Sequence, residues 1–175
     1  MVVHWCGTGL SAIPGLKKLI TDGKKVIVWN RTVSKAISAL EGVQATINEF
    51  NIDTLEHSLA SGDIIVSMLP GDWHVLLAKL AISKKAHFVS SSYISPEMRN
   101  LNNAAREARV SLVNEIGLDP GIDHLMAHKL VENLKKSEIL NAETAVSFLS
   151  YCGGVPKTPN EFKYKFSWSP LGVLK

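Results

Sequence analysis

The chain has 175 residues, which is enough for one domain, or for one domain and the beginning of a second. With 46% hydrophobic and 20% charged residues, it can bury a core and is excluded from the intrinsically disordered class. Its 19 basic and 16 acidic residues are scattered along the sequence and leave a net charge of only +3, so no basic stripe indicates a nucleic-acid partner.

Cysteine content and hydropathy favour a cytoplasmic location. Cys6 and Cys152 can form at most one disulfide, whereas a secreted domain of this size held by disulfides would need more. The N-terminus leads directly into the apolar residues 2–6 without a charged leader, and no apolar run approaches the ~20 residues of a membrane span. We therefore expect a soluble, cytoplasmic protein without a membrane partner.

Short apolar runs alternate with stretches of helical periodicity up to residue 114, as they do in a parallel sheet covered by helices. Gly23, Gly42 and Gly62 stand where helices end, and Ser95 before Pro96 is typical of a helix start. The alternation predicts right-handed βαβ units and hence an α/β fold, a Rossmann-type doubly wound parallel sheet over residues 1–120. The predicted order is strand 2–6, helix 12–22, strand 25–30, helix 34–40, a weaker strand 43–46, helix 53–60, strand 63–68, helix 72–84, strand 86–90, helix 96–109 and strand 110–114.

The pattern changes after Gly121. A helix is predicted over residues 122–136 and a strand over residues 145–151, followed by a tract rich in glycine and proline. The last residues, 162–175, alternate aromatic, basic and apolar side chains without closing a recognisable unit. We expect residues 121–175 to be the beginning of a second α/β domain, which the chain does not complete.

The first predicted strand leads into a glycine-rich turn. In a G-x-G-x-x-A fingerprint the first glycine allows the tight turn, the second lets the backbone approach a pyrophosphate, and the alanine lets helix and strand pack closely. The turn lies between a predicted strand and a predicted helix, which favours a nucleotide site over a purely structural turn. Pro14 must then lie in the first helical turn. The motif is Gly7-Thr8-Gly9-Leu10-Ser11-Ala12.

The second predicted strand ends in Asn30-Arg31-Thr32. A domain specific for NAD would place an aspartate or glutamate here to bind the ribose 2′-hydroxyl. A guanidinium instead pairs with a 2′-phosphate through charge-assisted hydrogen bonds, so Arg31 predicts NADP(H) as the cofactor. The alternative interpretation of Arg31 is an exposed loop charge.

Other polar and small residues follow the later strands, at residues 67–71, 90–93 and 114–121. Ligands of open α/β sheets bind at the carboxyl ends of the strands, and these residues suit a nicotinamide and a polar substrate. Turns also favour glycine, proline, serine and aspartate for purely conformational reasons.

Several of these motifs together resemble the saccharopine dehydrogenase family, and in particular its NADP-dependent, glutamate-forming branch. The likeness spans nearly the whole chain, and the last three motifs, all after residue 113, are long enough to be specific. The motifs lie at residues 2–31, 92–96, 114–124, 150–154 and 164–169.

The resemblance implies hydride transfer between NADPH and the imine formed from α-aminoadipate δ-semialdehyde and glutamate. The product is saccharopine, an intermediate of lysine metabolism, and the reverse reaction is an oxidative deamination. The partner is then a small-molecule amino-acid substrate. The resemblance further implies a Rossmann domain followed by an α/β substrate domain, and a homodimer formed through that second domain is an additional expectation.

The resemblance also implies site residues, carried over position by position. Ser92, Tyr93 and Asp119 would face the substrate. Asp119 and Tyr93 are the best acid/base candidates, with Cys152 a third titratable neighbour, although none forms a decisive catalytic dyad in the sequence. The cofactor would contact Gly7, Thr8, Gly9, Leu10, Ser11, Asn30, Arg31, Thr32, Ser67, Leu69, Pro70, Ser91, Leu118, Asp119, Pro120 and Trp168.

Three alternatives remain open. His124 and His128, four residues apart on a predicted helix with Asp119 and Asp123 nearby, suit a metal-dependent hydrolase. No H-E-x-x-H motif or distant ligand cluster completes such a site, so we expect no metal. The protein could instead be a family member that acts on another amine–carbonyl adduct, such as a polyamine precursor, or one that binds NADPH without catalysis.

Overall fold

The computed structural model describes residues 1–141, 143–153 and 156–164. The chain divides into two compact units, Met1–Ile122 and Asp123–Lys175, which are described separately.

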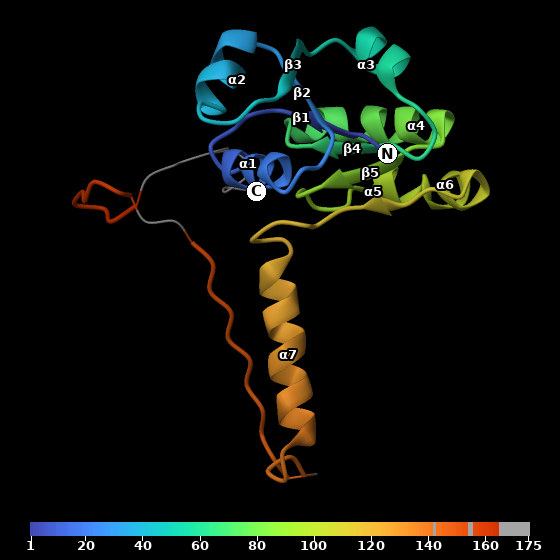
Figure 1. The fold of residues 1–175 in the computed structure, drawn as a ribbon. Helices are drawn as coiled ribbons and strands as arrows, with labels where there is room; N and C mark the ends of the chain where they lie inside the picture. The colour runs from blue at the N-terminus through green and yellow to red at the C-terminus, as the bar shows by residue number, and fades with distance from the viewer. Residues whose placement is uncertain (142, 154–155, 165–175) are drawn as a thin grey trace. The chain divides into compact units, whose positions relative to one another are not determined.

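One parallel sheet organises the first unit (Figure 1). Its strand order is β3-β2-β1-β4-β5-β6, and every neighbouring pair is parallel. This is the order of a doubly wound dinucleotide-binding domain, and it confirms the fold class predicted from the sequence. The strands are β1 (Val3–Cys6), β2 (Val26–Asn30), β3 (Thr46–Glu49), β4 (Ile64–Ser67), β5 (His87–Ser90) and β6 (Leu112–Val113).

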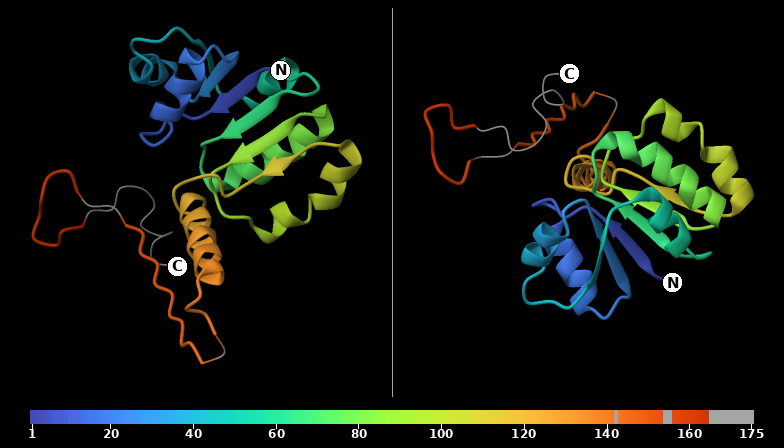
Figure 2. Two further views of the ribbon diagram at one scale, coloured as in Figure 1. Left: turned by 60° about the horizontal axis from the view of Figure 1, so that its bottom comes forward. Right: turned by 90° about the horizontal axis from the view of Figure 1, so that it is seen from above.

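Helices cover both faces of this sheet (Figure 2), which explains why its central strands are apolar on both sides. One core lies beneath α1 and α2 and contains Trp5, Leu16 and Val28; the other lies beneath α3 and α4 and contains Trp29 and Phe88. The helices are α1 (Ile13–Thr21), α2 (Val33–Ala39), α3 (Ile52–Ser58), the 3₁₀ helix η1 (Gly71–Trp73), α4 (His74–Lys84), α5 (Pro96–Arg99) and α6 (Asn102–Ala108).

Most predicted helix ends agree with the structure. Gly23 has a φ of +75° and, with Lys24, donates backbone hydrogen bonds to the last turn of α1, to Ile20 and Leu19. The Ser95 side chain accepts a hydrogen bond from the Met98 N–H and so caps α5. Pro14 lies in the first turn of α1, as the glycine fingerprint requires.

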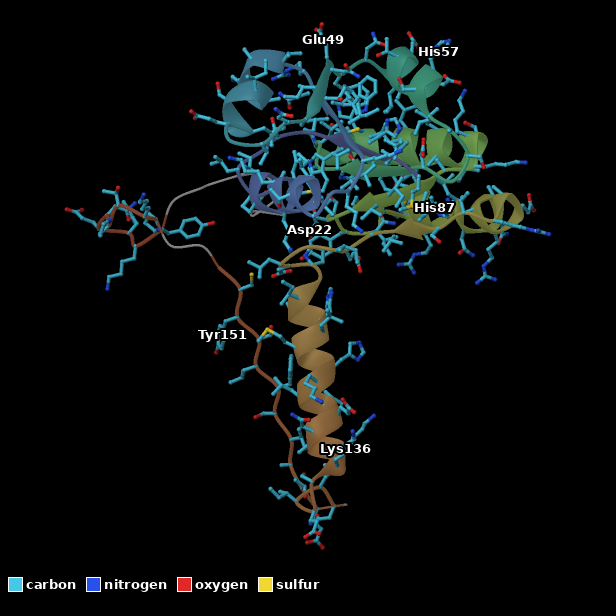
Figure 3. All side chains as sticks on the ribbon, viewed as in Figure 1. Asp22, Glu49, His57, His87, Lys136 and Tyr151 are labelled. Carbon is cyan, nitrogen blue, oxygen red and sulfur yellow. The ribbon has the colours of Figure 1, made fainter. Side chains whose placement is uncertain are left out.

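Two predicted elements of the first unit differ clearly from the structure. The third strand begins at Thr46 rather than at residue 43, because Val43 and Ala45 pack against the core beneath α1 and α2. The following residues form an edge strand whose last side chain, Glu49, is exposed (Figure 3). The predicted helix 96–109 is two helices, since Asn100 and Leu101 form a turn in a stretch rich in asparagine, a poor helix former.

The second unit contains most of α7 (Ile122–Lys136) and, in its described residues beyond α7, no further helix or strand. The predicted strand 145–151 is therefore wrong for this structure. A strand requires a neighbouring strand to hydrogen-bond with, and these described residues pair with none. In the part of the chain that the structure describes, no helix is both long and apolar enough to cross a membrane.

A buried polar cluster lies within the sheet of the first unit. His4 is fully buried on β1, and its Nδ1 accepts a hydrogen bond of 3.1 Å from the indole N–H of Trp29. Because an indole nitrogen can only donate, His4 carries its proton on Nε2, which lies 3.4 Å from the Asp63 carboxylate. Burial alone would raise the pKa of Asp63, but hydrogen bonds from the Val2 and Ala60 N–H groups and from His4 hold that pKa below its usual value.

Burial lowers the pKa of His4 more than the neighbouring Asp63 raises it, and burial also lowers the pKa of His74. Both imidazoles are therefore neutral in the folded protein at pH 7, whereas in the unfolded chain they take up protons below their ordinary pKa of 6.5.

The first prediction is that the folded state loses stability on acidification. Above pH 6.5 the contribution of both histidines is fully present, and it falls as the pH drops from 6.5 through their lowered folded-state pKa values. The free energy of unfolding, measured with urea between about pH 5 and pH 8, should therefore decrease toward the acidic end. His4→Gln and His74→Gln should each flatten this dependence, and an unchanged slope in both variants would contradict the assignment.

Candidate functional site

The glycine turn after β1 is fixed by a close backbone approach. Gly7 has a φ of +101°, and a Cβ atom at this position would lie 2.9 Å from the Met68 carbonyl oxygen at the end of β4. Its N–H donates to the Trp29 carbonyl, and its own carbonyl accepts a hydrogen bond from the Trp5 indole. Only glycine fits both this conformation and this space.

Asn30, the last residue of β2, connects the glycine turn to the loop that precedes α2. Its side-chain oxygen accepts a hydrogen bond of 3.2 Å from the Thr8 N–H, and its side-chain nitrogen donates one of 2.8 Å to the Thr32 carbonyl. Asn30 thus holds together the two loops that the sequence assigned to the cofactor.

The N-terminus of α1 is suited to an anion. Ala12, which precedes the helix, offers no side-chain cap, and Pro14 contributes no N–H. The remaining N–H groups of the first turn have no side-chain partner from the cap and can bind a phosphate. A Cβ atom at Gly9 would meet nothing within 4 Å, so the turn faces open space on the side where a ligand would approach.

A cleft of about 610 Å³ runs along the carboxyl ends of β1, β2 and β4. It brings together eight of the residues predicted to contact the cofactor: Gly7, Thr8, Gly9, Asn30, Arg31, Thr32, Leu69 and Pro70. It also contains Met68, from the predicted segment 67–71, and five residues that were not predicted from the sequence: Lys35, Phe50, Asn51, Ile52 and Trp73. Phe50 and Trp73 meet edge to face, with ring centroids 5.1 Å apart, and form an aromatic wall.

Lys35 is the most informative of the additional residues. It lies in the first turn of α2, four residues after Arg31, and lines the same cleft. A lysine in the first turn of a helix is disfavoured by the helix dipole unless an anion offsets it. The position of Lys35 in the sequence could therefore have indicated an anion site. Together, Lys35 and Arg31 make this end of the cleft basic.

A second cleft of about 540 Å³ lies beside α1, where β4, β5 and residues 116–119 meet. Its lining includes four of the predicted residues, Ser11, Ser91, Leu118 and Asp119. Met68 lines both clefts. The predicted cofactor residues of the first unit are therefore spread along one edge of the sheet.

The loop after β6 is tied to the segment after β5. Glu115, which has a φ of +62°, donates its N–H to the Ser92 carbonyl, and its side chain accepts a hydrogen bond from the Ile94 N–H. The Tyr93 hydroxyl donates to the Asp119 carboxylate over 2.8 Å. The two best acid/base candidates thus lie within hydrogen-bonding distance of each other, and Ser92 precedes Tyr93 in the chain.

The other predicted residues are placed differently. Ser67 is fully buried and lines neither cleft, Pro120 is buried in the same loop as Asp119, and Leu10 is exposed in the glycine turn. Cys152 is an exposed residue of the second unit, and Trp168 lies outside the described residues.

The residues considered for a metal site do not assemble one. His124 lies 3.7 Å from Asp123 on α7. Among residues 1–141, 143–153 and 156–164, no group of three or more histidine, cysteine, aspartate or glutamate side chains could hold a metal ion.

Two family models match the chain in succession. Residues 3–113 match the saccharopine dehydrogenase NADP-binding domain, and residues 117–175 match the saccharopine dehydrogenase C-terminal domain. Among curated proteins, the NADP⁺-dependent, L-glutamate-forming saccharopine dehydrogenase of Pyricularia oryzae is 41% identical over 96% of this chain and 38% of its own length. The mitochondrial alpha-aminoadipic semialdehyde synthase of Bos taurus is 34% identical over 96% of this chain and 19% of its own length. The chain therefore spans well under half of these relatives.

Solved structures agree with these matches. Apo saccharopine dehydrogenase (L-Glu forming) from Saccharomyces cerevisiae superposes with a TM-score of 0.84 and 37% identity, covering 99% of this chain and 40% of that one. KijD10, a 3-ketoreductase from Actinomadura kijaniata, superposes with a TM-score of 0.60 at 16% identity over 79% of this chain and 45% of that one, a likeness of fold alone.

The second prediction separates the two glycines of the turn. Gly7→Ala should destabilise the first unit by about 1–3 kcal/mol, because the new Cβ requires a strained backbone and approaches the Met68 carbonyl. Gly9→Ala, whose Cβ meets no atom, should leave stability unchanged but weaken cofactor binding. Urea unfolding and fluorescence titration with NADPH measure the two effects. Equal destabilisation by both variants would contradict the distinct roles.

The third prediction concerns cofactor selectivity. Arg31→Ala and Lys35→Ala should each weaken NADPH binding by roughly 10- to 100-fold and NADH binding much less, because the lost ion pairs involve only the 2′-phosphate. Lys18→Ala, which removes an exposed lysine of α1 outside both clefts, serves as the matched control. Equal losses for both cofactors in a fluorescence titration would overturn this assignment.

Proposed function

Because this chain belongs to the saccharopine dehydrogenase family, we propose that it carries the cofactor-binding part of an NADP-dependent oxidoreductase that reduces the imine of α-aminoadipate δ-semialdehyde and glutamate to saccharopine. The same enzyme would catalyse the reverse reaction in lysine metabolism. The observation that carries the proposal is the basic end of the first cleft, which combines the glycine turn with Arg31 and Lys35.

The residues present fit NADP(H). The glycine turn leaves room for a pyrophosphate, the uncapped start of α1 supplies N–H donors, and the two cations suit a 2′-phosphate. When bound, NADPH would supply the hydride for reduction of the imine carbon. Ser91, Leu118 and Asp119 line the second cleft and would face the nicotinamide end.

We assign the proton transfers to Tyr93, in the segment after β5, and to Asp119, in the loop after β6. Formation of the imine and its reduction require protons to move on the amine and on the departing water. The Asp119 carboxylate is exposed toward the second cleft and accepts a hydrogen bond from the Tyr93 hydroxyl, which holds that carboxylate in one orientation. Asp119 and Tyr93 would thus bind the substrate amine and exchange its proton, with Cys152 the third candidate in the second unit.

Two further parts of the proposal concern the whole protein. A homodimer formed through the second domain is expected from the resemblance. A cytoplasmic location is expected from the low cysteine content.

The fourth prediction tests the reaction. The full-length enzyme that contains this chain should consume NADPH with α-aminoadipate δ-semialdehyde plus glutamate, measured as the loss of absorbance of the reduced cofactor. Turnover only with lysine plus 2-oxoglutarate would indicate the lysine-forming reaction instead. Turnover with neither pair, despite tight NADPH binding, would favour another amine–carbonyl adduct or a non-catalytic NADPH-binding role.

A further inference from the structure

A second buried histidine, His74, contacts Ser92, one of the residues that the resemblance assigns to the substrate. His74, the first residue of α4, is 5% exposed, and its ring and the Phe88 ring of β5 meet edge to face. Its Nδ1 lies 3.0 Å from the Ser67 hydroxyl at the end of β4, and its Nε2 lies 2.8 Å from the Ser92 hydroxyl just after β5. One imidazole therefore links two neighbouring strand ends at the ligand-binding edge of the sheet.

The hydrogen-bond pattern fixes the tautomer of this ring. The Ser67 side chain is fully buried, and within the part of the chain that the structure describes its hydroxyl oxygen is hydrogen-bonded to His74 Nδ1. A buried hydroxyl must give its proton to an acceptor, so Ser67 donates to Nδ1. A neutral imidazole has a single N–H, which then lies on Nε2 and donates to the Ser92 oxygen.

This orientation leaves the Ser92 hydroxyl proton directed away from the imidazole. Ser92 is half-buried, and the next residue, Tyr93, reaches Asp119. With its oxygen accepting from His74, the Ser92 O–H can donate to an oxygen of a bound ligand, and an anionic oxygen such as a carboxylate is the strongest acceptor.

We propose that His74 is a positioning residue: its Nε2–H donates to the Ser92 oxygen and so holds the Ser92 hydroxyl as a donor to a carboxylate of the substrate. The inference rests on the proposed function, because it takes Ser92 to face the substrate. It adds to that function a chain of two hydrogen bonds that runs from Ser67 at the end of β4, through His74, to Ser92.

The tautomer can be measured without any activity. Two-dimensional NMR that correlates the ring protons with the ring nitrogens should give the Nε2–H pattern for His74 in the ligand-free protein, with the signal assigned through His74→Gln. The Ser67→Ala variant should allow the Nδ1–H form to appear, because Nδ1 then loses its donor. An Nδ1–H tautomer or a protonated ring at neutral pH in the unmodified protein would overturn the proposal.

The link to the substrate is tested by kinetics. His74→Phe should raise the KM for the amino-acid substrate by roughly tenfold and leave the KM for NADPH little changed, as Ser92→Ala should. The double variant should lose no more than Ser92→Ala alone, because both substitutions remove the same interaction. His74→Gln, whose amide N–H can replace the imidazole donor, should recover much of the loss. His57→Gln, on the surface of α3 (Figure 3), is the control and should behave like the unmodified protein.

The outcomes separate this inference from the proposed function. If the role of His74 is purely structural, His74→Phe should lower the thermal stability but leave the substrate KM of the folded enzyme unchanged, whether or not Ser92 is also replaced. That result would overturn the proposal. If the unmodified protein turns over neither substrate pair, the proposed function fails, and the NMR measurement still decides whether His74 orients Ser92.

Discussion

The contact between the glycine turn and the end of β4 is the constraint on which the rest of the site depends. β1 and β4 are paired neighbours at the point where the order of the sheet reverses, and beyond their last pair the turn after β1 can approach the Met68 carbonyl because Gly7 has no side chain. A bulkier residue would separate the two strand ends. Gly7 lines the first cleft and Met68 lines both clefts, so this one backbone approach contributes to the shape of each.

Much of the fold follows from local sequence patterns. The buried strands are short apolar runs, and some helix ends carry a residue suited to them, as Gly23 and Ser95 do. The third strand was misplaced because its apolar signal comes from Val43 and Ala45, which belong to the core and not to the ladder. An edge strand pairs on one side only and needs little hydrophobicity, so its position is set by contacts with β2 that a local pattern does not contain.

The site was predictable where a motif carries its own chemistry. The glycine turn and Arg31 fall into this class, since a conformation or a charge at one position is enough to suggest a role. The link between Ser67, His74 and Ser92 does not, because it joins residues that are unremarkable alone and meet only after two βα units have packed. Lys35 lies between these cases: its position opposes the helix dipole, but only the folded cleft shows that it shares a surface with Arg31.

The two hydrogen bonds of Asn30 have a consequence for the cost of binding. They join the glycine turn to the loop that carries Arg31 before any ligand is present. A cofactor that met two independently moving loops would have to restrict both, and that lost freedom would be subtracted from its affinity. Here the folded chain has already restricted them, so the site is preorganised, and its affinity for a dinucleotide depends on an amide that need not touch the ligand at all.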